Sequence, residues 1–237
     1  MKYISIFLVC ASILVLFYCV VSLYSNIRAS QSLISTTEPF VINSEDYTTT
    51  LLVLGDSTAV GVGATLPSES IPGRLASYIG ATYVENLAVS GARTADLFEQ
   101  KTQVTRASYT YILVQIGGND IIRFKSAKKS AQELERVLSD LPNSAHLIVL
   151  SAGNVGAAQF FPRVLRPLHA RLNRAYHESF DLVVRETGGM YINLYADPSL
   201  DPFVLFPERY LADDGLHPSS DGYEVWFLRI VEKLSQE

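Results

Sequence analysis

The stretch TLLVLGDSTAVG, from Thr50 to Gly61, places an aliphatic run directly before a turn of small and polar residues. An uninterrupted apolar run of this kind is typical of a parallel strand that is buried on both faces. Gly55, Asp56 and Ser57 are common turn residues. Either the turn only ends a buried strand, or it holds the Ser57 hydroxyl at the rim of a sheet, and the rest of the chain must decide.

Short aliphatic runs and helical patterns alternate after this stretch. With Thr50–Gly55, the predicted strands are Thr82–Ala88, Tyr109–Gly117, Ala145–Ser151 and Gly189–Tyr195. The predicted helices are Ile71–Tyr78, Thr94–Lys101, Ala127–Leu138, Pro167–Glu186 and a last one from Pro218 to about Leu234. Such alternation predicts a doubly wound, five-stranded parallel sheet. In the common strand order 2-1-3-4-5, a ligand binds beyond the carboxyl ends of strands one and three.

Composition limits the classes of protein to which the chain can belong. Its 237 residues, 48% of them hydrophobic and 18% charged, fit one medium-sized domain with an appendage. A net charge of −5 gives no basis for nucleic-acid binding, which needs a basic surface. Both cysteines, Cys10 and Cys19, lie near the N-terminus, so the rest of the chain has no disulfide and no cysteine metal site.

Residues 1–26 form the appendage. The run from Ile4 to Leu23 contains no charge and has the length that a helix needs to cross a bilayer. We expect a transmembrane helix that stays attached as an anchor; a cleaved signal peptide and a buried core helix are the alternatives. Lys2 before the span favours a domain outside the cytoplasm, periplasmic or at the cell surface. Residues 27–49, rich in Ser, Thr and Asn, are expected to be a linker, and residues 50–237 the folded domain.

Four short motifs follow predicted strands or precede the last predicted helix. They are GDST with Ser57, AVSGAR with Gly91, IGGND with Asn119, and DGLHP with Asp214 and His217. Together and in this order they resemble the motifs of the SGNH hydrolases, also called GDSL-type esterases and lipases. The similarity is greatest to the small bacterial thioesterase and lysophospholipase members, and the motifs span almost the whole predicted domain. One departure is Thr58, where the family name has Leu.

The resemblance implies a flavodoxin-like, three-layer α/β/α fold and a set of catalytic roles. Ser57 would be the nucleophile, His217 its general base, and Asp214 the group that orients the imidazole. The backbone N–H groups of Ser57 and Gly91 and the side chain of Asn119 would form the oxyanion hole. These roles suit the chemistry, because a serine hydroxyl needs an adjacent base and a tetrahedral intermediate needs fixed hydrogen-bond donors.

Each of these residues also has a purely structural interpretation. Ser57 could cap a helix, Gly91 could be a turn glycine, and Asn119 could form an Asx turn. Asp213 competes with Asp214 as the partner of His217, but the spacing of three residues places Asp214 on the same face of a helical turn as the histidine. The presence of all four motifs favours the catalytic interpretation.

No cofactor and no metal are expected. His169 and His177 lie eight residues apart on one predicted helix without a third ligand, and we interpret both as surface or half-buried residues. Phe160 and Phe161 follow the fourth strand and either line an acyl groove or cap the core.

The sequence therefore predicts a membrane-anchored serine esterase that hydrolyses ester or thioester bonds of an acylated lipid or glycan through an acyl-enzyme. An acyltransferase that acts on envelope sugars would use the same triad, and a non-catalytic binding module could share the fold. A module of that kind would be expected to have lost its nucleophile or base, whereas this chain has both Ser57 and His217.

Overall fold

The computed structural model describes residues 2–161, 164 and 166–236, and its centre is a five-stranded parallel sheet. The strand order is β2-β1-β3-β4-β5, which confirms the predicted topology. The strands are β1 (Thr50–Gly55), β2 (Tyr83–Asn86), β3 (Ser108–Gln115), β4 (Asn143–Leu150) and β5 (Met190–Ile192). Their pairing is parallel throughout, so every strand ends at the same edge of the sheet.

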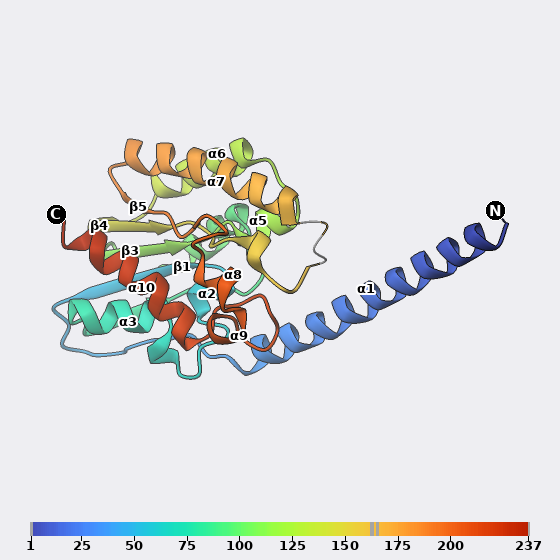
Figure 1. Ribbon diagram of the computed structural model, residues 1–237. Helices are drawn as coiled ribbons and strands as arrows, with labels where there is room; N and C mark the ends of the chain where they lie inside the picture. Colours follow the sequence, from blue (N-terminus) through green and yellow to red (C-terminus); the bar gives the residue numbers. More distant parts are fainter. Residues whose placement is uncertain (1, 162–163, 165, 237) are drawn as a thin grey trace.

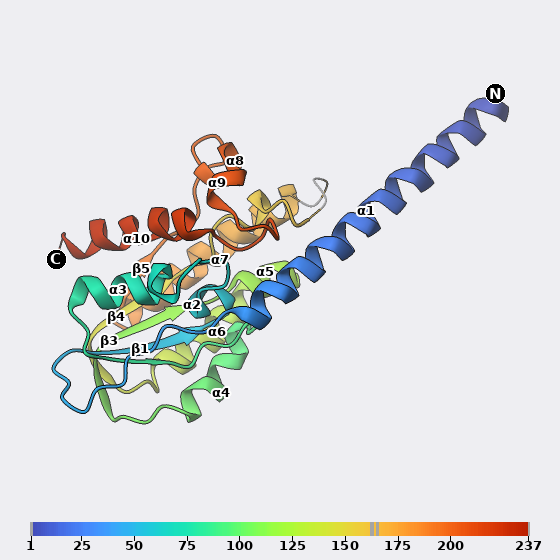
Figure 2. The same ribbon diagram turned by 90° about the horizontal axis from the view of Figure 1, so that it is seen from below.

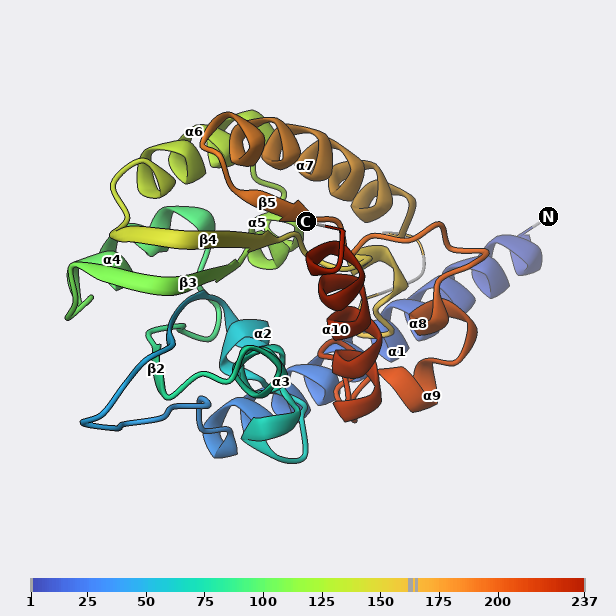
Figure 3. The ribbon, with the colours of Figure 1, turned by 90° about the vertical axis from the view of Figure 1, so that its left-hand side faces the viewer.

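Helices cover both faces of this sheet and complete the predicted three-layer arrangement (Figures 1 and 3). One face carries α4 (Leu97–Thr102), α6 (Ala127–Leu138) and α7 (Arg166–Glu186). The other face carries α3 (Ile71–Ile79) and α10 (Ser220–Leu234). These bounds lie close to the predicted ones, because each of the longer helices has a clear apolar stripe.

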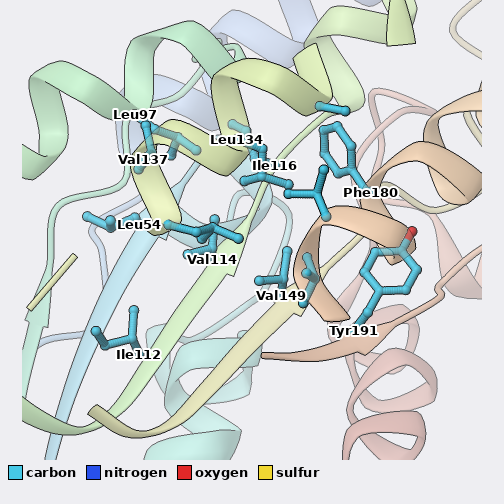
Figure 4. Close-up of a cluster of buried hydrophobic side chains, with 14 of the residues drawn as sticks. Leu54, Leu97, Ile112, Val114, Ile116, Leu134, Val137, Val149, Phe180 and Tyr191 are labelled. Atoms are coloured by element: carbon cyan, nitrogen blue, oxygen red, sulfur yellow. The ribbon is translucent and has the colours of Figure 1, made fainter. Parts of the chain in front are cut away.

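The alternation of side chains along β1 explains why the sheet is buried on both faces. Leu52 and Leu54 point into the core beneath α4, α6 and α7. Figure 4 shows Leu54 in this core. Leu51 and Val53 point into the core beneath α3 and α10. All four side chains are fully buried, as expected for a central parallel strand whose successive residues face opposite layers.

Several short elements were absent from the sequence prediction. They are α2 (Ser57–Val60), α5 (Gly118–Ile122), α8 (Pro202–Leu205) and α9 (Pro207–Tyr210), with 3₁₀ turns at Pro67–Glu69 and Val155–Ala157; a third 3₁₀ turn, Thr94–Asp96, opens the helix predicted at Thr94–Lys101. Each is too short to show a helical period in the sequence. Two of them, α2 and α5, begin directly beyond the carboxyl ends of β1 and β3.

The N-terminal helix α1 (Lys2–Thr36) extends from the domain as one long rod (Figures 1 and 2). Its described apolar part has a mean hydropathy of 1.5 and is only 6% buried, which fits a membrane helix or a signal sequence and not a core helix. The expectation of a linker from residue 27 is wrong up to residue 36, because the helix continues there and packs against the domain. After it, Ile42 forms an isolated antiparallel bridge to Val84 of β2.

The turn after β1 depends on a glycine. Gly55 has φ +149°, and a Cβ there would lie 2.1 Å from the backbone oxygen of Gln115 in β3. The side chain of Gln100 in α4 binds both backbone groups of Gly55, at 2.8 Å each. The chain therefore leaves the sheet in one fixed direction, which positions the residues that follow.

We expect Gly55→Ala to lower the free energy of unfolding by about 3 kcal/mol or more, because the new methyl group overlaps the β3 backbone. Gly80→Ala is the matched control: Gly80 also has a positive φ, +64°, but nothing lies within 4 Å of its Cβ position. The control should cost only about 1 kcal/mol. Urea unfolding of both variants measures the difference, and equal losses would contradict this account of the turn.

Candidate active site

Ser57 and His217 are joined by a hydrogen bond although 160 residues separate them in the chain. Ser57 is the first residue of α2 and is 7% exposed. Its Oγ lies 2.8 Å from Nε2 of His217, a residue that is 4% exposed. This distance suits the transfer of the hydroxyl proton to the imidazole.

Asp214 holds the other side of the imidazole. Its Oδ2 lies 2.6 Å from Nδ1 of His217, and its Oδ1 accepts the backbone N–H groups of Leu216 and His217 at 2.9 and 3.0 Å. Burial by itself would raise the pKa of Asp214, but the hydrogen bonds from His217 and from the backbone outweigh it, so the pKa is lowered. The carboxylate therefore stays ionised beside the ring.

The pairing of Asp214 with His217 does not use a helical turn, as the sequence analysis had assumed. The segment between them is an irregular turn in which Gly215 adopts φ +65°. Asp213, the competing carboxylate, is exposed, whereas Asp214 is buried. The three-residue spacing therefore identified the aspartate that pairs with His217, but the segment between them is a turn and not the helical turn on which that argument was based.

Asp56 caps the helix that carries Ser57. Its Oδ1 accepts the backbone N–H of Thr58 at 2.9 Å and the Thr58 hydroxyl at 2.7 Å. Burial raises the pKa of the Asp56 carboxyl, and the bonds from Thr58 oppose this effect only in part. Thr58, the departure from the family name, thus supports the cap. A side chain without a hydroxyl would keep the backbone bond to Asp56 but lose the second one.

Gly91 and Asn119 line the same cavity as Ser57, each in a segment that follows a different strand. Gly91 has φ +84°, with nothing within 4 Å of its Cβ position. Asn119 lies in α5, and its Nδ2 donates to the backbone oxygen of Ala92 at 3.0 Å. An amide nitrogen carries two hydrogens, so one remains for a ligand. Among the residues that the structure describes, the backbone N–H groups of Ser57 and Gly91 have no protein acceptor.

Asp120 fixes these loops relative to one another, a role that the sequence did not reveal. Its Oδ2 accepts the backbone N–H and the hydroxyl of Thr94, at 2.9 and 3.0 Å, and its Oδ1 accepts the Ser130 hydroxyl at 3.1 Å. Asp120 therefore ties α5 to the segment after Gly91 and to α6. An Asx turn, the simple interpretation of an aspartate in this position, does not describe it.

Ser57, Gly91, Asn119 and His217 line one cavity of about 150 Å³, which we call the Ser57 pocket. Most of its other walls are apolar. The additional lining residues include Ile122, Val155, Phe203, Leu216 and Trp226 from the domain, and Ser30 and Ile34 from α1. The contribution of α1 was not predicted.

Gln115, at the end of β3, also lines the Ser57 pocket. It is 1% exposed, and neither polar atom of its side chain has a hydrogen-bond partner among the described residues. Leaving a buried amide unpaired costs about 1–3 kcal/mol. Its donors and acceptor are therefore available to a bound molecule or to water.

The structure also tests the interpretations of His169, His177 and Phe161. His169 is fully buried, stacked on Phe124 and packed against Phe161, so its interpretation as a surface or half-buried residue is wrong. His177 bonds the Tyr191 hydroxyl and the Asn193 amide at 3.0 Å each. Phe161 packs against the core, so of its two predicted roles it covers the core and does not line an acyl groove.

Solved structures with the same arrangement of elements include a phospholipase and a lipase/acylhydrolase. A phospholipase A1 from Streptomyces albidoflavus NA297 aligns with a TM-score of 0.59 and 17% identity over 78% of this chain and 99% of its own. A lipase/acylhydrolase from Enterococcus faecalis aligns with a TM-score of 0.59 and 19% identity over 79% of this chain and 95% of its own. At these identities the likeness establishes the fold.

Sequence comparison establishes the family. Thioesterase 1/protease 1/lysophospholipase L1 of Escherichia coli K12 is 27% identical over 195 residues, which cover 78% of this chain and 84% of that protein. The sequence model of the GDSL-like Lipase/Acylhydrolase family matches residues 53–225, the greater part of the chain. The protein therefore belongs to the GDSL-like lipase/acylhydrolase (SGNH) family and is an ester hydrolase.

Proposed function

We propose that this hydrolase cleaves an ester or thioester of an acylated lipid or glycan through an acyl-enzyme formed on Ser57. The observation that carries the proposal is the buried chain of hydrogen bonds from the Ser57 hydroxyl through His217 to Asp214. Ser57 and His217 line a pocket whose walls are otherwise mostly apolar.

Acylation begins when His217 Nε2 accepts the Ser57 proton as Oγ attacks the carbonyl carbon of the substrate. The imidazolium that forms is stabilised by the ionised carboxylate of Asp214, which also keeps the proton of the neutral ring on Nδ1. As the tetrahedral intermediate collapses, His217 returns the proton to the departing alcohol or thiol. The acyl group remains on Ser57.

The negative oxygen of that intermediate would lie among three donors. These are the backbone N–H groups of Ser57 and Gly91 and the second Nδ2 hydrogen of Asn119. Because Asn119 is neutral and is held by Ala92, it can meet developing charge without reorganising. A water molecule then attacks the acyl-enzyme with His217 again as the base, and the acid is released.

The apolar walls support an acyl substrate. A hydrocarbon chain placed along Ile122, Val155 and Leu216 would leave water and gain roughly 0.8 kcal/mol per buried CH₂ group. The name of the Escherichia coli relative, a thioesterase and lysophospholipase, agrees with an acyl thioester or ester. We further propose that α1 anchors the domain in a membrane, with the domain on the extracytoplasmic side.

Ser57→Ala should lower kcat for p-nitrophenyl butyrate by at least about 10⁴-fold, because no other group can form the acyl-enzyme. Circular dichroism and the melting temperature should stay close to those of the wild type. Ser77→Ala, an exposed serine in α3, is the control and should keep full activity. Wild-type rates in the Ser57→Ala variant would refute the assignment of the nucleophile.

Asn119→Ala should lower kcat by about 10²–10³-fold with a small change in KM, since the lost donor acts on the transition state. Asn143→Ala, at the exposed start of β4, serves as the control. Steady-state kinetics separate the two parameters. A change confined to KM would mean that Asn119 binds substrate and does not stabilise the oxyanion.

Asp214→Asn should lower kcat by about 10²–10⁴-fold, because an amide favours the wrong tautomer of His217. Asp213→Asn should have little effect. The ionisation of Asp214 also affects stability. Its pKa is lowered on folding, so the carboxylate stabilises the native state at pH values above the ordinary aspartate pKa of about 3.9. This contribution is lost as the pH falls through the lowered pKa.

Urea unfolding between pH 7 and pH 3 tests the stability effect. The wild type should exceed Asp214→Asn in stability at pH 7, and the difference should shrink toward the acid end. A difference that does not depend on pH would contradict the ionised state of Asp214.

A further inference from the structure

The last turns of α1 run alongside the domain (Figure 2), and two of their residues line the Ser57 pocket. The side-chain Nδ2 of Asn26 donates to the backbone oxygen of Phe160, in the loop after β4, at 3.3 Å. One turn later Ser30 is 8% exposed and lines the pocket, and Ile34 lines it another turn on. The contact therefore extends over three turns of the helix.

These contacts lie on one face of α1. Asn26, Ser30 and Ile34 follow one another at intervals of four residues, which places them in a row along the helix. Ile27, on the turn before Ser30, is 38% exposed and does not line the pocket. The helix thus presents a defined edge to the site, and this edge ends in the aliphatic side chain of Ile34.

We propose that residues 26–34 of α1 form a wall of the substrate pocket, and that this wall admits acyl esters presented by the membrane in which the preceding part of α1 lies. The proposal rests on the proposed function of Ser57 as the nucleophile. It adds a substrate class, a membrane lipid ester, and a specificity-determining residue, Ile34.

The length of the helix supports this substrate class. The apolar span expected to cross the membrane ends at Leu23, and the seven residues from there to Ser30 rise by about 10 Å. The headgroup layer on each side of a bilayer is about 5–8 Å thick. The Ser57 pocket would therefore open just outside the headgroups. Because α1 is continuous through Thr36, a helix and not a flexible tether fixes this height.

The wall also explains why α1 should remain attached. Cleavage in the segment SNIRAS, Ser25–Ser30, would separate the span from the domain and leave the Asn26 and Ser30 contacts at a free chain end. A signal peptide that is discarded has no need to complete the active site of the mature enzyme. The purified protein should therefore begin before Asn26.

Substitution of Ile34 in the full-length protein tests the wall. Ile34→Trp should fill the pocket and lower the ratio of kcat/KM for p-nitrophenyl octanoate to that for p-nitrophenyl acetate by about tenfold. Ile34→Ala should raise the ratio. Ile27→Trp, the same change on the exposed side of the same helix, should leave it unaltered.

The outcomes distinguish failure of the proposed wall from failure of the proposed nucleophile. If the wild type cleaves these esters and loses activity in Ser57→Ala, but Ile34→Trp has the wild-type ratio, the wall is refuted and the nucleophile stands. If the wild type cleaves neither ester, both proposals fail. Melting temperatures near that of the wild type exclude misfolding of the variants as the cause.

Presentation by the membrane needs a second measurement. The full-length protein is reconstituted in dioleoylphosphatidylcholine vesicles, and 4-methylumbelliferyl palmitate is placed either in the same vesicles or in separate ones. We expect at least about tenfold faster hydrolysis in the same vesicles, because the substrate then shares the surface of the enzyme. Equal rates, or a mature N-terminus after Ser30 by mass spectrometry, would overturn the proposal.

Discussion

The parallel pairing of the five strands is the constraint on which the site depends. Because all strands run in one direction, the segments after β1, β2, β3 and β4 emerge at one edge, where the segment before α10 joins them. Ser57, Gly91, Asn119 and His217 come from four of these segments and line one pocket. An antiparallel sheet of the same sequence would send alternate segments to opposite edges. Side chains supply the chemistry, but strand direction brings them together.

Buried polar groups then hold this edge in a fixed geometry. Gln100 binds the backbone of Gly55 just before Ser57, Asp120 links the Gly91 and Asn119 segments, and Asp214 accepts two backbone N–H groups as well as the imidazole. Each is expensive to bury unless its bonds are made. With these bonds made, the folded protein holds the donors and acceptors of the site in place before a substrate binds. Such preorganised groups are what electrostatic catalysis requires.

The features that could be predicted from the sequence are those with a strong local pattern. The aliphatic run before Gly55 predicted β1, and the apolar stripe of Ala127–Leu138 predicted α6 with the observed bounds. The candidate site followed from a resemblance carried by four motifs. Roles that depend on distant partners could not be found: Asp120 has the sequence context of a turn residue, yet its partners lie 26 and 10 residues away. The packing of α1 against the domain was likewise hard to predict from the sequence, because the contacting residues Asn26 and Ser30 are polar.

The central claim is that Ser57 carries the acyl group. The most direct measurement is labelling of the full-length protein with a fluorophosphonate probe, followed by mass spectrometry of its peptides. The account predicts one phosphonylated residue, Ser57, and a loss of esterase activity in proportion to the label. An active enzyme that is labelled at another residue, or that stays unlabelled while its ester hydrolysis continues, would contradict it.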